Sequence, residues 1–552
     1  MASHMSNGTT QDLISSYYTQ GKQIFLIPLT FPDVTQAGSN LERISYGGNV
    51  WELRVDLLRP DELTKLPSKD YVLSQLDWLR RGSDLPIIFT IRTVSQGGKF
   101  PDDAAPEALE LMLLAAQYGC EYIDVEFPWP EYLKQEIVKH KGASKLIASV
   151  HDWTGEVKWS DSLFEHYIKQ NTYGGELRQT TGIYLRFTLT TLADILKLSF
   201  QASAIEDCYE LALLQRKYRT QSSKPIISVS MGQAGQLSRI ISPISFVTHP
   251  LIPAPSAPGQ ISLAQVNHAK HLMGQLPKRN FYIFGNNISH SLSPTIHNTA
   301  FAELGLPHHY SIHETPCIDD TVRDLMQSPQ FGGASVTFPH KLNIQPLLDS
   351  VSDASTRLGA VNTVIVESDA KSGRSLRGEN TDWIGILRCI QGSGLTKLDV
   401  GLVIGAGGAA RAAVFAYRQL GVRRICLVNR TRSTAERLVA DFSPLEIDIY
   451  ESLVEAPTAD VIVSCIPADD VTEADIPEHI FARGSGVVIE MSYRPPVSAL
   501  MRVASRQPGW KVEDGVAVLK EQAYCQFEMW TGRRAPVLAI REALDKRNAA
   551  KP

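Results

Sequence analysis

The sequence lacks several features that would place a protein of this size in a specialised class. No run of about 18 apolar residues occurs, and the polar start MASHMSNGTTQDL lacks the apolar region of a secretory signal. The 7 cysteines are odd in number, widely spread and without a Cys-x-x-Cys pair, which argues against a disulfide framework and a zinc site. We therefore expect a protein of the reducing cytosol, neither membrane-bound nor metal-binding.

Charge of one sign is not in excess. The 552 residues include 54 Lys and Arg against 59 Asp and Glu, a net charge of −5, with no long basic run. This balance indicates neither a nucleic-acid surface nor a polybasic membrane anchor, so small molecules are the expected partners, and self-association into a homodimer is left open. A hydrophobic content of 43% predicts a chain that folds throughout, into about three domains.

The first half of the chain contains eight short apolar, β-branched runs, most of them separated by stretches of helical periodicity. The runs are QIFLIPLT, NVWELRVD, PIIFTIR, YIDVEF, KLIASVHD, ADILKLSF, PIISVSMG and ISFVTHP, between residues 23 and 250. Eightfold alternation of strand and helix predicts a (β/α)8 TIM barrel, whose active site lies at the C-terminal ends of the strands.

Polar residues late in these runs are therefore candidates for chemistry. Lys197 stands in an otherwise apolar run, and a buried ammonium is costly unless it is paired or neutralised. A neutral lysine beside a histidine and arginines suits imine chemistry on an anionic keto acid. Taken singly, each charge can instead be solvated or part of a structural ion pair. The candidates are Glu52, Arg54, Arg92, Asp124, Glu126, His151 and Lys197.

The segments ELRVD, FTIRT, SVHDW, DILKL, SMGQAGQLSR and SAPGQ follow one another in this order within residues 22–265. In this set the chain resembles the type I 3-dehydroquinate dehydratases. The resemblance implies Lys197 as the Schiff-base lysine and His151 as the general acid and base. It further implies a set of substrate-binding residues, namely Glu52, Arg54, Arg92, Arg239, Ser256 and Gln260.

Two features depart from that family's pattern. Gln96 stands where bacterial members carry Glu, which bears on how His151 is oriented. His151 and Lys197 are 46 positions apart, roughly twenty more than a short connection in such barrels needs. The additional segment, NTYGGELRQTTGIYLRFTLTT, is either a surface insertion or a mis-joined coding segment.

In the second half, VGLVIGAGGAARAAVFAYRQLG is an apolar strand followed by a Gly-rich turn and an Ala-rich helix. This context predicts a dinucleotide site rather than an ordinary tight turn, because glycines let a pyrophosphate approach a helix N-terminus. The next strand ends in basic residues where an NAD enzyme places an acidic one, so NADP is the expected cofactor, unless the turn is merely solvated. The cofactor candidates are Gly405, Ala406, Gly407, Gly408, Ala409, Asn429, Arg430, Thr431 and Arg432.

Three further clusters, ISHSLSPTIHN, GGASVTFPHKL and GAVNTV with GENTDWIG, complete a resemblance to the shikimate dehydrogenases from about residue 281 to 548. The resemblance implies Lys341 and Asp382 as the catalytic pair. Without it, Lys341 can be an exposed loop lysine and Asp382 a helix N-cap. The implied substrate-binding residues are Ser291, Ser293, Thr337, Asn362 and Gln522, and Ser335 replaces the Asn of many members.

Together the halves resemble the last two modules of the fungal pentafunctional arom polypeptides, which implies two successive steps of the shikimate pathway, a lyase and an NADP-dependent oxidoreductase. The quinate repressors share these modules but do not catalyse these reactions. Lys197, His151, Lys341 and Asp382 are all present here, which favours an enzyme over such a repressor. We expect a flexible tail (1–21), a dehydratase-like barrel (22–268), a substrate-binding domain (281–395), a Rossmann domain (396–510) and C-terminal helices packing back on the substrate domain (511–548).

Overall fold

The computed structural model describes residues 12–59, 66–159, 193–369, 373–468, 471–492 and 495–549. The chain divides into two compact units, Met1–Leu276 with Leu304–Leu306, and Pro277–Glu303 with Pro307–Pro552. The additional segment before Lys197 lies outside the described residues. No helix among the described residues is long and apolar enough to cross a membrane.

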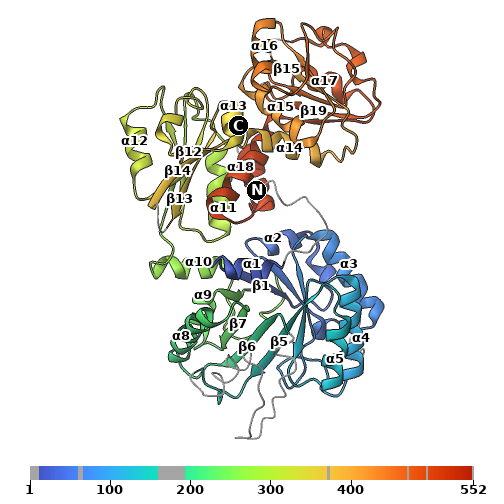
Figure 1. The fold of residues 1–552 in the computed structure, drawn as a ribbon, viewed down its shortest axis with the longest axis vertical. Helices are drawn as coiled ribbons and strands as arrows, with labels where there is room; N and C mark the ends of the chain where they lie inside the picture. Colours follow the sequence, from blue (N-terminus) through green and yellow to red (C-terminus); the bar gives the residue numbers. More distant parts are fainter. Residues whose placement is uncertain are drawn as a thin grey trace. The chain divides into compact units, whose positions relative to one another are not determined.

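The first unit is a parallel barrel of eight strands (Figure 1). The predicted strands are all confirmed, as β1 (Ile24–Leu29), β2 (Val50–Arg54), β3 (Ile87–Thr90), β4 (Tyr122–Glu126), β5 (Lys145–Asp152), β6 (Ile195–Gln201), β7 (Ile226–Met231) and β8 (Ile244–Phe246). Hydrogen-bonded pairing runs in chain order from β7 back to β1, and then from β1 to β8. The predicted TIM barrel is confirmed.

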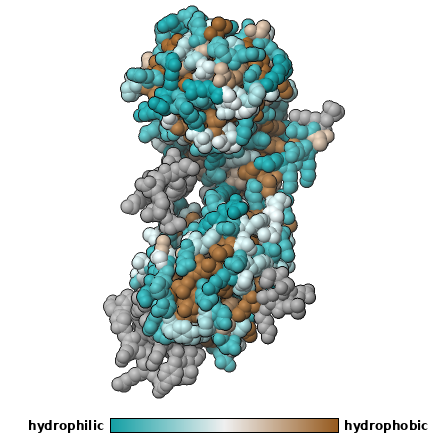
Figure 2. All heavy atoms as spheres, turned by 90° about the vertical axis from the view of Figure 1, so that its right-hand side faces the viewer, coloured by the Kyte–Doolittle hydropathy of each residue, from teal (hydrophilic) through white to brown (hydrophobic). Residues whose placement is uncertain are grey.

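Helices follow most of the barrel strands and cover them. They are η1 (Val34–Asn40), α2 (Leu41–Ser45), η2 (Val55–Leu57), α3 (Lys69–Gly82), α4 (Ala105–Tyr118), α5 (Glu131–His140), α8 (Glu206–Gln221), α9 (Gln236–Ile241) and α10 (Leu263–Leu272). In α3 the side chain of Ser68 caps the N-terminus, and Val72, Leu76 and Leu79 form the buried face. Figure 2 shows the side of the barrel on which α3, α4 and α5 lie, where hydrophilic side chains border bands of apolar ones.

The ends of this unit differ from the sequence expectation. Residues 12–21, assigned to a flexible tail, include helix α1 (Leu13–Thr19), which Asp12 caps and whose Ile14 and Tyr18 are buried. Two apolar side chains four positions apart share one helix face, which explains why this short helix packs. At the other end, α10 continues to Leu272, past the expected boundary at 268.

The connection between β5 and β6 does not disturb their pairing. The two strands stay in parallel register from Ile147 opposite Ile195 to Asp152 opposite Phe200. Ser149 is therefore opposite Lys197, and His151 is opposite Ser199. The two residues expected to carry the chemistry of the barrel thus lie on hydrogen-bonded neighbouring strands, whatever the length of chain between them.

The second unit begins with a mixed six-stranded sheet of order β10-β9-β11-β13-β14-β12. Its strands are β9 (Asn280–Gly285), β10 (His309–Glu314), β11 (Phe331–Val336), β12 (Ser350–Val351), β13 (Thr363–Asp369) and β14 (Gly373–Glu379). The associated helices are α11 (Ser293–Glu303), α12 (Asp320–Gln327), η3 (Gln345–Leu347) and α13 (Asp353–Leu358). Phe284, Val322 and Phe331 belong to its core.

A second six-stranded sheet, entirely parallel, has the order β17-β16-β15-β18-β19-β20. Its strands are β15 (Val400–Ile404), β16 (Arg424–Val428), β17 (Ile447–Tyr450), β18 (Val461–Ser464), β19 (Gly486–Glu490) and β20 (Trp510–Glu513). Leu402 and Val403 belong to different apolar cores, one on each face of the sheet. This order is that of the dinucleotide-binding Rossmann fold, which confirms the prediction. The strand β20 continues past the expected boundary at 510.

Helices connect and complete the two sheets. They are α14 (Asp382–Gly392), α15 (Gly408–Leu420), α16 (Arg432–Asp441), η5 (Glu473–Asp475), η6 (Glu478–Phe481), α17 (Ala499–Ser505), α18 (Gly515–Thr531) and α19 (Val537–Ala549). The long helix α18 packs against α14 and α11, and α19 packs against α11. The end of the chain therefore contacts elements of the first sheet of this unit.

Candidate active sites

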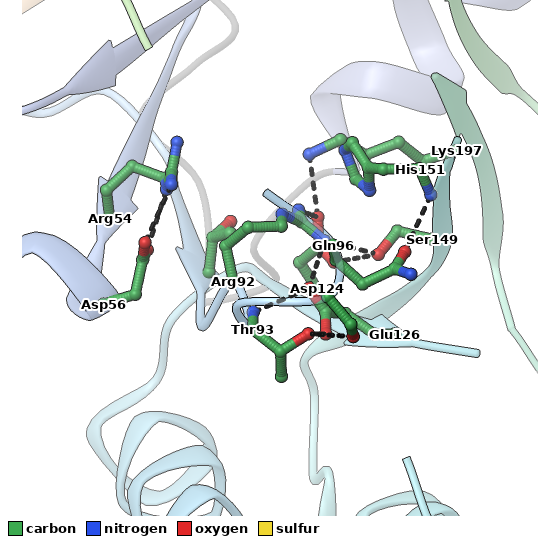
Figure 3. A network of polar contacts seen from close by, with 12 residues as sticks. Arg54, Asp56, Arg92, Thr93, Gln96, Asp124, Glu126, Ser149, His151 and Lys197 are labelled. Atoms are coloured by element: carbon green, nitrogen blue, oxygen red, sulfur yellow. Dashed lines mark hydrogen bonds and ion pairs between the residues drawn. The ribbon is translucent and has the colours of Figure 1, made fainter. Parts of the chain in front are cut away.

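Lys197 lies inside the barrel between two carboxylates (Figure 3). Its Nζ is 2.9 Å from Glu52 Oε1 and 2.8 Å from Asp124 Oδ2, and the side chain is almost completely buried. On another side, Nζ lies 4.6 Å from the centre of the Phe246 ring. The sequence predicted a histidine and arginines near this lysine, but its nearest charged partners are the two carboxylates.

The barrel geometry explains this surrounding. Glu52, Asp124, Lys197 and Phe246 come from β2, β4, β6 and β8. Side chains from alternate strands fill one layer of a barrel interior, so these four residues meet across the barrel although the chain neighbours of Lys197 are apolar. Asp124 is a candidate from the sequence, but only the layer shows that it faces the lysine.

Arg92 bonds to both carboxylates of β4 and to a serine of β5. Its guanidinium donates to Asp124 Oδ2 at 2.9 Å, to Glu126 Oε1 at 2.7 Å and to Ser149 Oγ at 3.1 Å. Burial alone would raise the pKa of Asp124, but Arg92 and Lys197 outweigh it and lower the pKa to about 2. Asp124 is therefore a fixed negative charge, and Arg92 has most of its donors engaged by protein groups.

His151 lies near the end of β5 with a neutral imidazole. Its backbone N–H donates to Gln96 Oε1 at 2.8 Å, and its Nδ1 has no hydrogen-bond partner among the described residues. Burial, then the positive charges of Arg92, Lys197 and Arg54, lowers the pKa of His151 well below its ordinary value. Gln96 thus holds the backbone of His151 and leaves the ring free to exchange a proton.

A cavity of about 50 Å³ at this end of the barrel brings the predicted residues together. Arg239 is buried, its Nη2 donates to the Pro258 carbonyl at 3.1 Å, and its Nε has no partner among the described residues. Burial lowers the pKa of Arg239 to about 10, as expected for a guanidinium without a carboxylate beside it. The predicted residues that line the cavity are Glu52, Arg54, Arg92, His151, Lys197, Arg239 and Ser256.

Two of the predicted substrate ligands, Arg54 and Gln260, are bonded to other residues of the protein. Arg54 forms a two-bond pair with Asp56, with both nitrogen–oxygen distances at 2.8 Å. Gln260 is absent from the cavity lining, and its Oε1 accepts from the backbone N–H of Ser256 at 2.8 Å. Gln260 therefore orients Ser256, while Ser256 faces the cavity.

In the second unit, a cavity of about 930 Å³ contains the other predicted catalytic pair. Lys341 Nζ is 2.5 Å from Asp382 Oδ2, and Asn362 Nδ2 donates to the other carboxylate oxygen at 2.9 Å. Asp382 is the first residue of α14 and Thr381 is its N-cap, so Asp382 is not the capping residue that the alternative interpretation required. Nor is Lys341 a free surface lysine.

The remaining predicted residues line the same cavity, namely Ser291, Ser293, Thr337, Asn362 and Gln522. Asn362 also donates to Gln522 Oε1 at 3.1 Å. Ser335 and Gln526 are among the lining residues that were not predicted as ligands. The Ser335 hydroxyl accepts from Tyr310 at 2.7 Å and donates to Gln526 Oε1 at 2.8 Å, so this departure from the family pattern forms a complete hydrogen-bond chain.

The Gly-rich turn after β15 fits a dinucleotide. Gly405 has a φ of +103°, and a Cβ there would lie 2.7 Å from the Ile466 side chain. Gly407 caps α15 and Gly408 begins it, and a Cβ on either would meet no atom within 4 Å. The N-terminus of α15 therefore opens onto free space, flanked by Ala406 and Ala409, where a pyrophosphate can approach.

The basic turn after β16 contains two arginines that differ in their ion-pair partners. Arg430 is exposed and has no hydrogen-bond or ion-pair partner among the described residues. Arg432 is also exposed, but its guanidinium is 3.1 Å from Glu436 and 3.5 Å from Glu451. Asn429 Nδ2 donates to the Thr431 carbonyl at 2.8 Å and so holds the turn in shape.

No group of three or more potential metal ligands occurs among the residues that the structure describes.

Comparison with known proteins agrees with this division. Residues 25–277 match the family model described as type I 3-dehydroquinase, residues 283–364 match the shikimate dehydrogenase substrate binding domain, and residues 515–544 match the shikimate 5′-dehydrogenase C-terminal domain. A solved structure, "Dehydroquinate dehydratase and shikimate dehydrogenase from S. pombe AroM", is 36% identical, covers 96% of this chain and 99% of its own, and has a TM-score of 0.78. The chain belongs to this family of fused type I 3-dehydroquinases and shikimate dehydrogenases.

Longer and shorter relatives also match. The pentafunctional AROM polypeptide of Malassezia globosa is 42% identical over 530 residues, which are 94% of this chain and 32% of that protein. The chain thus spans about a third of the length of the curated relatives it matches. A shikimate 5-dehydrogenase from Thermus thermophilus, solved in complex with NADP(H) and shikimate, is 31% identical, covers 48% of this chain and 99% of its own, and has a TM-score of 0.41.

Proposed function

We propose that the chain catalyses two consecutive reactions, the dehydration of 3-dehydroquinate to 3-dehydroshikimate and the NADPH-dependent reduction of 3-dehydroshikimate to shikimate. The observation that supports this most strongly is that each unit brings a complete catalytic pair to one cavity. These are Lys197 with His151 in the barrel, and Lys341 with Asp382 in the second unit. A metabolite sensor without catalysis would have no need of either pair.

In the first reaction, Lys197 supplies the nucleophile. Before attack, its ammonium must lose a proton, and Glu52 Oε1 at 2.9 Å is the better acceptor because Asp124 is already bonded to Arg92 and Ser149. The amine then adds to the substrate ketone, and loss of water gives an imine. The fixed negative charge of Asp124 stabilises the cationic imine nitrogen that replaces the ammonium.

His151 then moves protons on the imine. Its neutral ring removes the proton from the carbon next to the imine and afterwards donates a proton to the departing hydroxyl. Hydrolysis of the product imine restores Lys197. Arg239, a buried guanidinium without a carboxylate partner, binds the substrate carboxylate, and Arg54 and Ser256 complete the polar lining.

In the second reaction, Lys341 and Asp382 handle the proton at the substrate oxygen. NADPH, when bound, supplies the hydride. Ser291 and Ser293 hold the substrate carboxylate, and Thr337, Asn362 and Gln522 contact its hydroxyl groups. Lys341 donates the proton to the nascent alkoxide, and Asp382, held by Asn362, keeps the ammonium aimed into the cavity.

The same proposal assigns the cofactor site and the domains. The turn from Gly405 to Ala409 holds the pyrophosphate, and the turn from Asn429 to Arg432 holds the 2′-phosphate. The barrel is the dehydratase domain, the first sheet of the second unit binds the substrate, and the second sheet binds the nucleotide. The reducing cytosol is the compartment that suits NADPH and seven unpaired cysteines.

A coupled assay tests both activities. Supplied with 3-dehydroquinate and NADPH, the full chain should oxidise NADPH, and with 3-dehydroshikimate it should do so without a lag. Lys197→Ala should abolish only the response to 3-dehydroquinate, whereas Lys341→Ala should slow both and let 3-dehydroshikimate accumulate. A chain that reduces 3-dehydroshikimate but does not consume 3-dehydroquinate would overturn the first half of the proposal, and one that does neither would favour a sensor.

A further inference from the structure

Arg547, in the last turn of α19, reaches back to the loop between β9 and α11. Its Nη1 donates to the Ser291 carbonyl at 3.1 Å and to Thr295 Oγ1 at 2.7 Å, and its Nη2 donates to the His290 carbonyl at 3.4 Å. A single guanidinium thus joins the end of the chain to the loop and to the first turn of α11. No motif in the sequence predicts a role for this residue.

The loop that Arg547 holds carries the carboxylate-binding serines. Its first residues are tied elsewhere, since Asn286 N–H donates to the Phe338 carbonyl at 3.0 Å and Ile288 N–H to Glu314 Oε2 at 3.1 Å. At Ser291 the contact from outside the loop comes from Arg547, whose Nη1 donates to the Ser291 carbonyl. Ser291 Oγ in turn accepts the N–H of Ser293 at 3.2 Å, so a shift of Ser291 displaces both serines.

We propose that Arg547 is a positioning residue for the substrate carboxylate, acting through Ser291 and Ser293. The inference rests on the proposed function of this cavity. Arg547 itself is outside the cavity lining, whereas both serines and the adjacent Asn548 belong to it. Three donors in one rigid plane can hold two successive carbonyls and a hydroxyl at once, a geometry that a lysine cannot reproduce in full. The positive charge behind the serines also favours an anionic substrate group.

The nucleotide site provides an internal control. The Gly-rich turn and the basic turn lie on the second sheet and share none of the contacts of Arg547. Loss of Arg547 should therefore weaken binding of the carboxylate substrate and leave nucleotide binding unchanged. A residue that merely stabilised the fold would not separate the two.

The test compares Arg547→Ala, Arg547→Lys and the matched control Arg541→Ala in the full chain. Arg541 is exposed on the same helix and has no hydrogen-bond or ion-pair partner among the described residues. For Arg547→Ala we expect KM for 3-dehydroshikimate to rise about tenfold or more, as misplacement of a substrate-positioning group costs up to about a hundredfold. KM for NADPH should stay within about twofold, and shikimate affinity in an equilibrium titration should fall in parallel with the KM change.

Arg547→Lys should lie between wild type and alanine, and Arg541→Ala should equal wild type. An unchanged KM for 3-dehydroshikimate in Arg547→Ala would overturn the inference, as would an equal rise of both KM values or the same loss in Arg541→Ala. Absence of 3-dehydroshikimate reduction by the wild-type chain would instead refute the proposed function of the cavity.

Discussion

On the proposed assignment of the turn after β16 to the 2′-phosphate of NADPH, replacement of Arg430 by alanine should remove most of the preference for NADPH over NADH. Arg430 has no partner among the described residues, so binding a phosphate breaks no existing pair. Arg432 differs, because it must first leave Glu436 at 3.1 Å and Glu451 at 3.5 Å. Two neighbouring arginines of one turn should therefore contribute unequally.

The magnitude follows from one charge-assisted contact. A hydrogen bond to a charged group contributes about 1.5–3 kcal/mol, so Arg430→Ala should lower kcat/KM for NADPH by roughly 10- to 150-fold. Arg432→Ala should cost less, since part of its interaction with phosphate replaces its existing ion pairs. Neither change should affect kcat/KM for NADH, which has no phosphate at that position.

Initial rates of 3-dehydroshikimate reduction with NADPH and with NADH, for wild type and both variants, measure these ratios. Repetition at high salt adds a check, because a contact between exposed charges weakens with screening. An equal loss for both cofactors in Arg430→Ala, or a larger loss in Arg432→Ala than in Arg430→Ala, would contradict the assignment of Arg430 to the 2′-phosphate.

Three further changes have defined outcomes. Asp382→Asn should slow shikimate oxidation by about a hundredfold or more, because Lys341 loses its carboxylate partner, while NADP affinity in a fluorescence titration stays unchanged; joint loss of both would indicate damage to the fold. Gln96→Glu places a carboxylate beside His151, so the pKa of His151 should rise. The acid limb of the pH profile of kcat/KM for 3-dehydroquinate should then move to higher pH. An unmoved limb would contradict the assignment of His151 as the general acid and base. Burial lowers the pKa of His297 to about 3, so below pH 6.5 the unfolded chain binds a proton that the folded chain does not. The free energy of unfolding should therefore be about 2 kcal/mol lower at about pH 5 than at pH 7 because of this histidine. His297→Gln should flatten the pH dependence of the urea midpoint of dehydrogenase inactivation, and an unchanged slope would count against this interpretation.

Much of the fold could be predicted from the sequence, because the pattern of apolar runs is a local property. Each barrel strand was recognised from its own β-branched residues, and the Gly-rich turn was recognised because it lies between an apolar strand and an Ala-rich helix. The family assignments of both halves, made on short motifs, are confirmed by the comparisons.

The surroundings of the site residues could not be predicted in the same way, because they depend on register and on contacts distant in the sequence. Asp124 meets Lys197 across 73 positions only because both belong to the same layer of the barrel. Arg547 reaches Ser291 across 256 positions through the packing of α19 on α11. Likewise, the pairing of Arg432 with Glu451 depends on where β17 ends, which no spacing of residues indicates.

The proposed dehydration depends on an imine between Lys197 and 3-dehydroquinate. Sodium borohydride added to the full chain with this substrate should reduce the imine, and mass spectrometry should find a stable adduct on the peptide that contains Lys197. Lys134, also buried in the barrel unit, should remain unmodified, and Lys197→Ala should yield no adduct. Absence of an adduct on Lys197, in a preparation that still reduces 3-dehydroshikimate with NADPH, would contradict the claim.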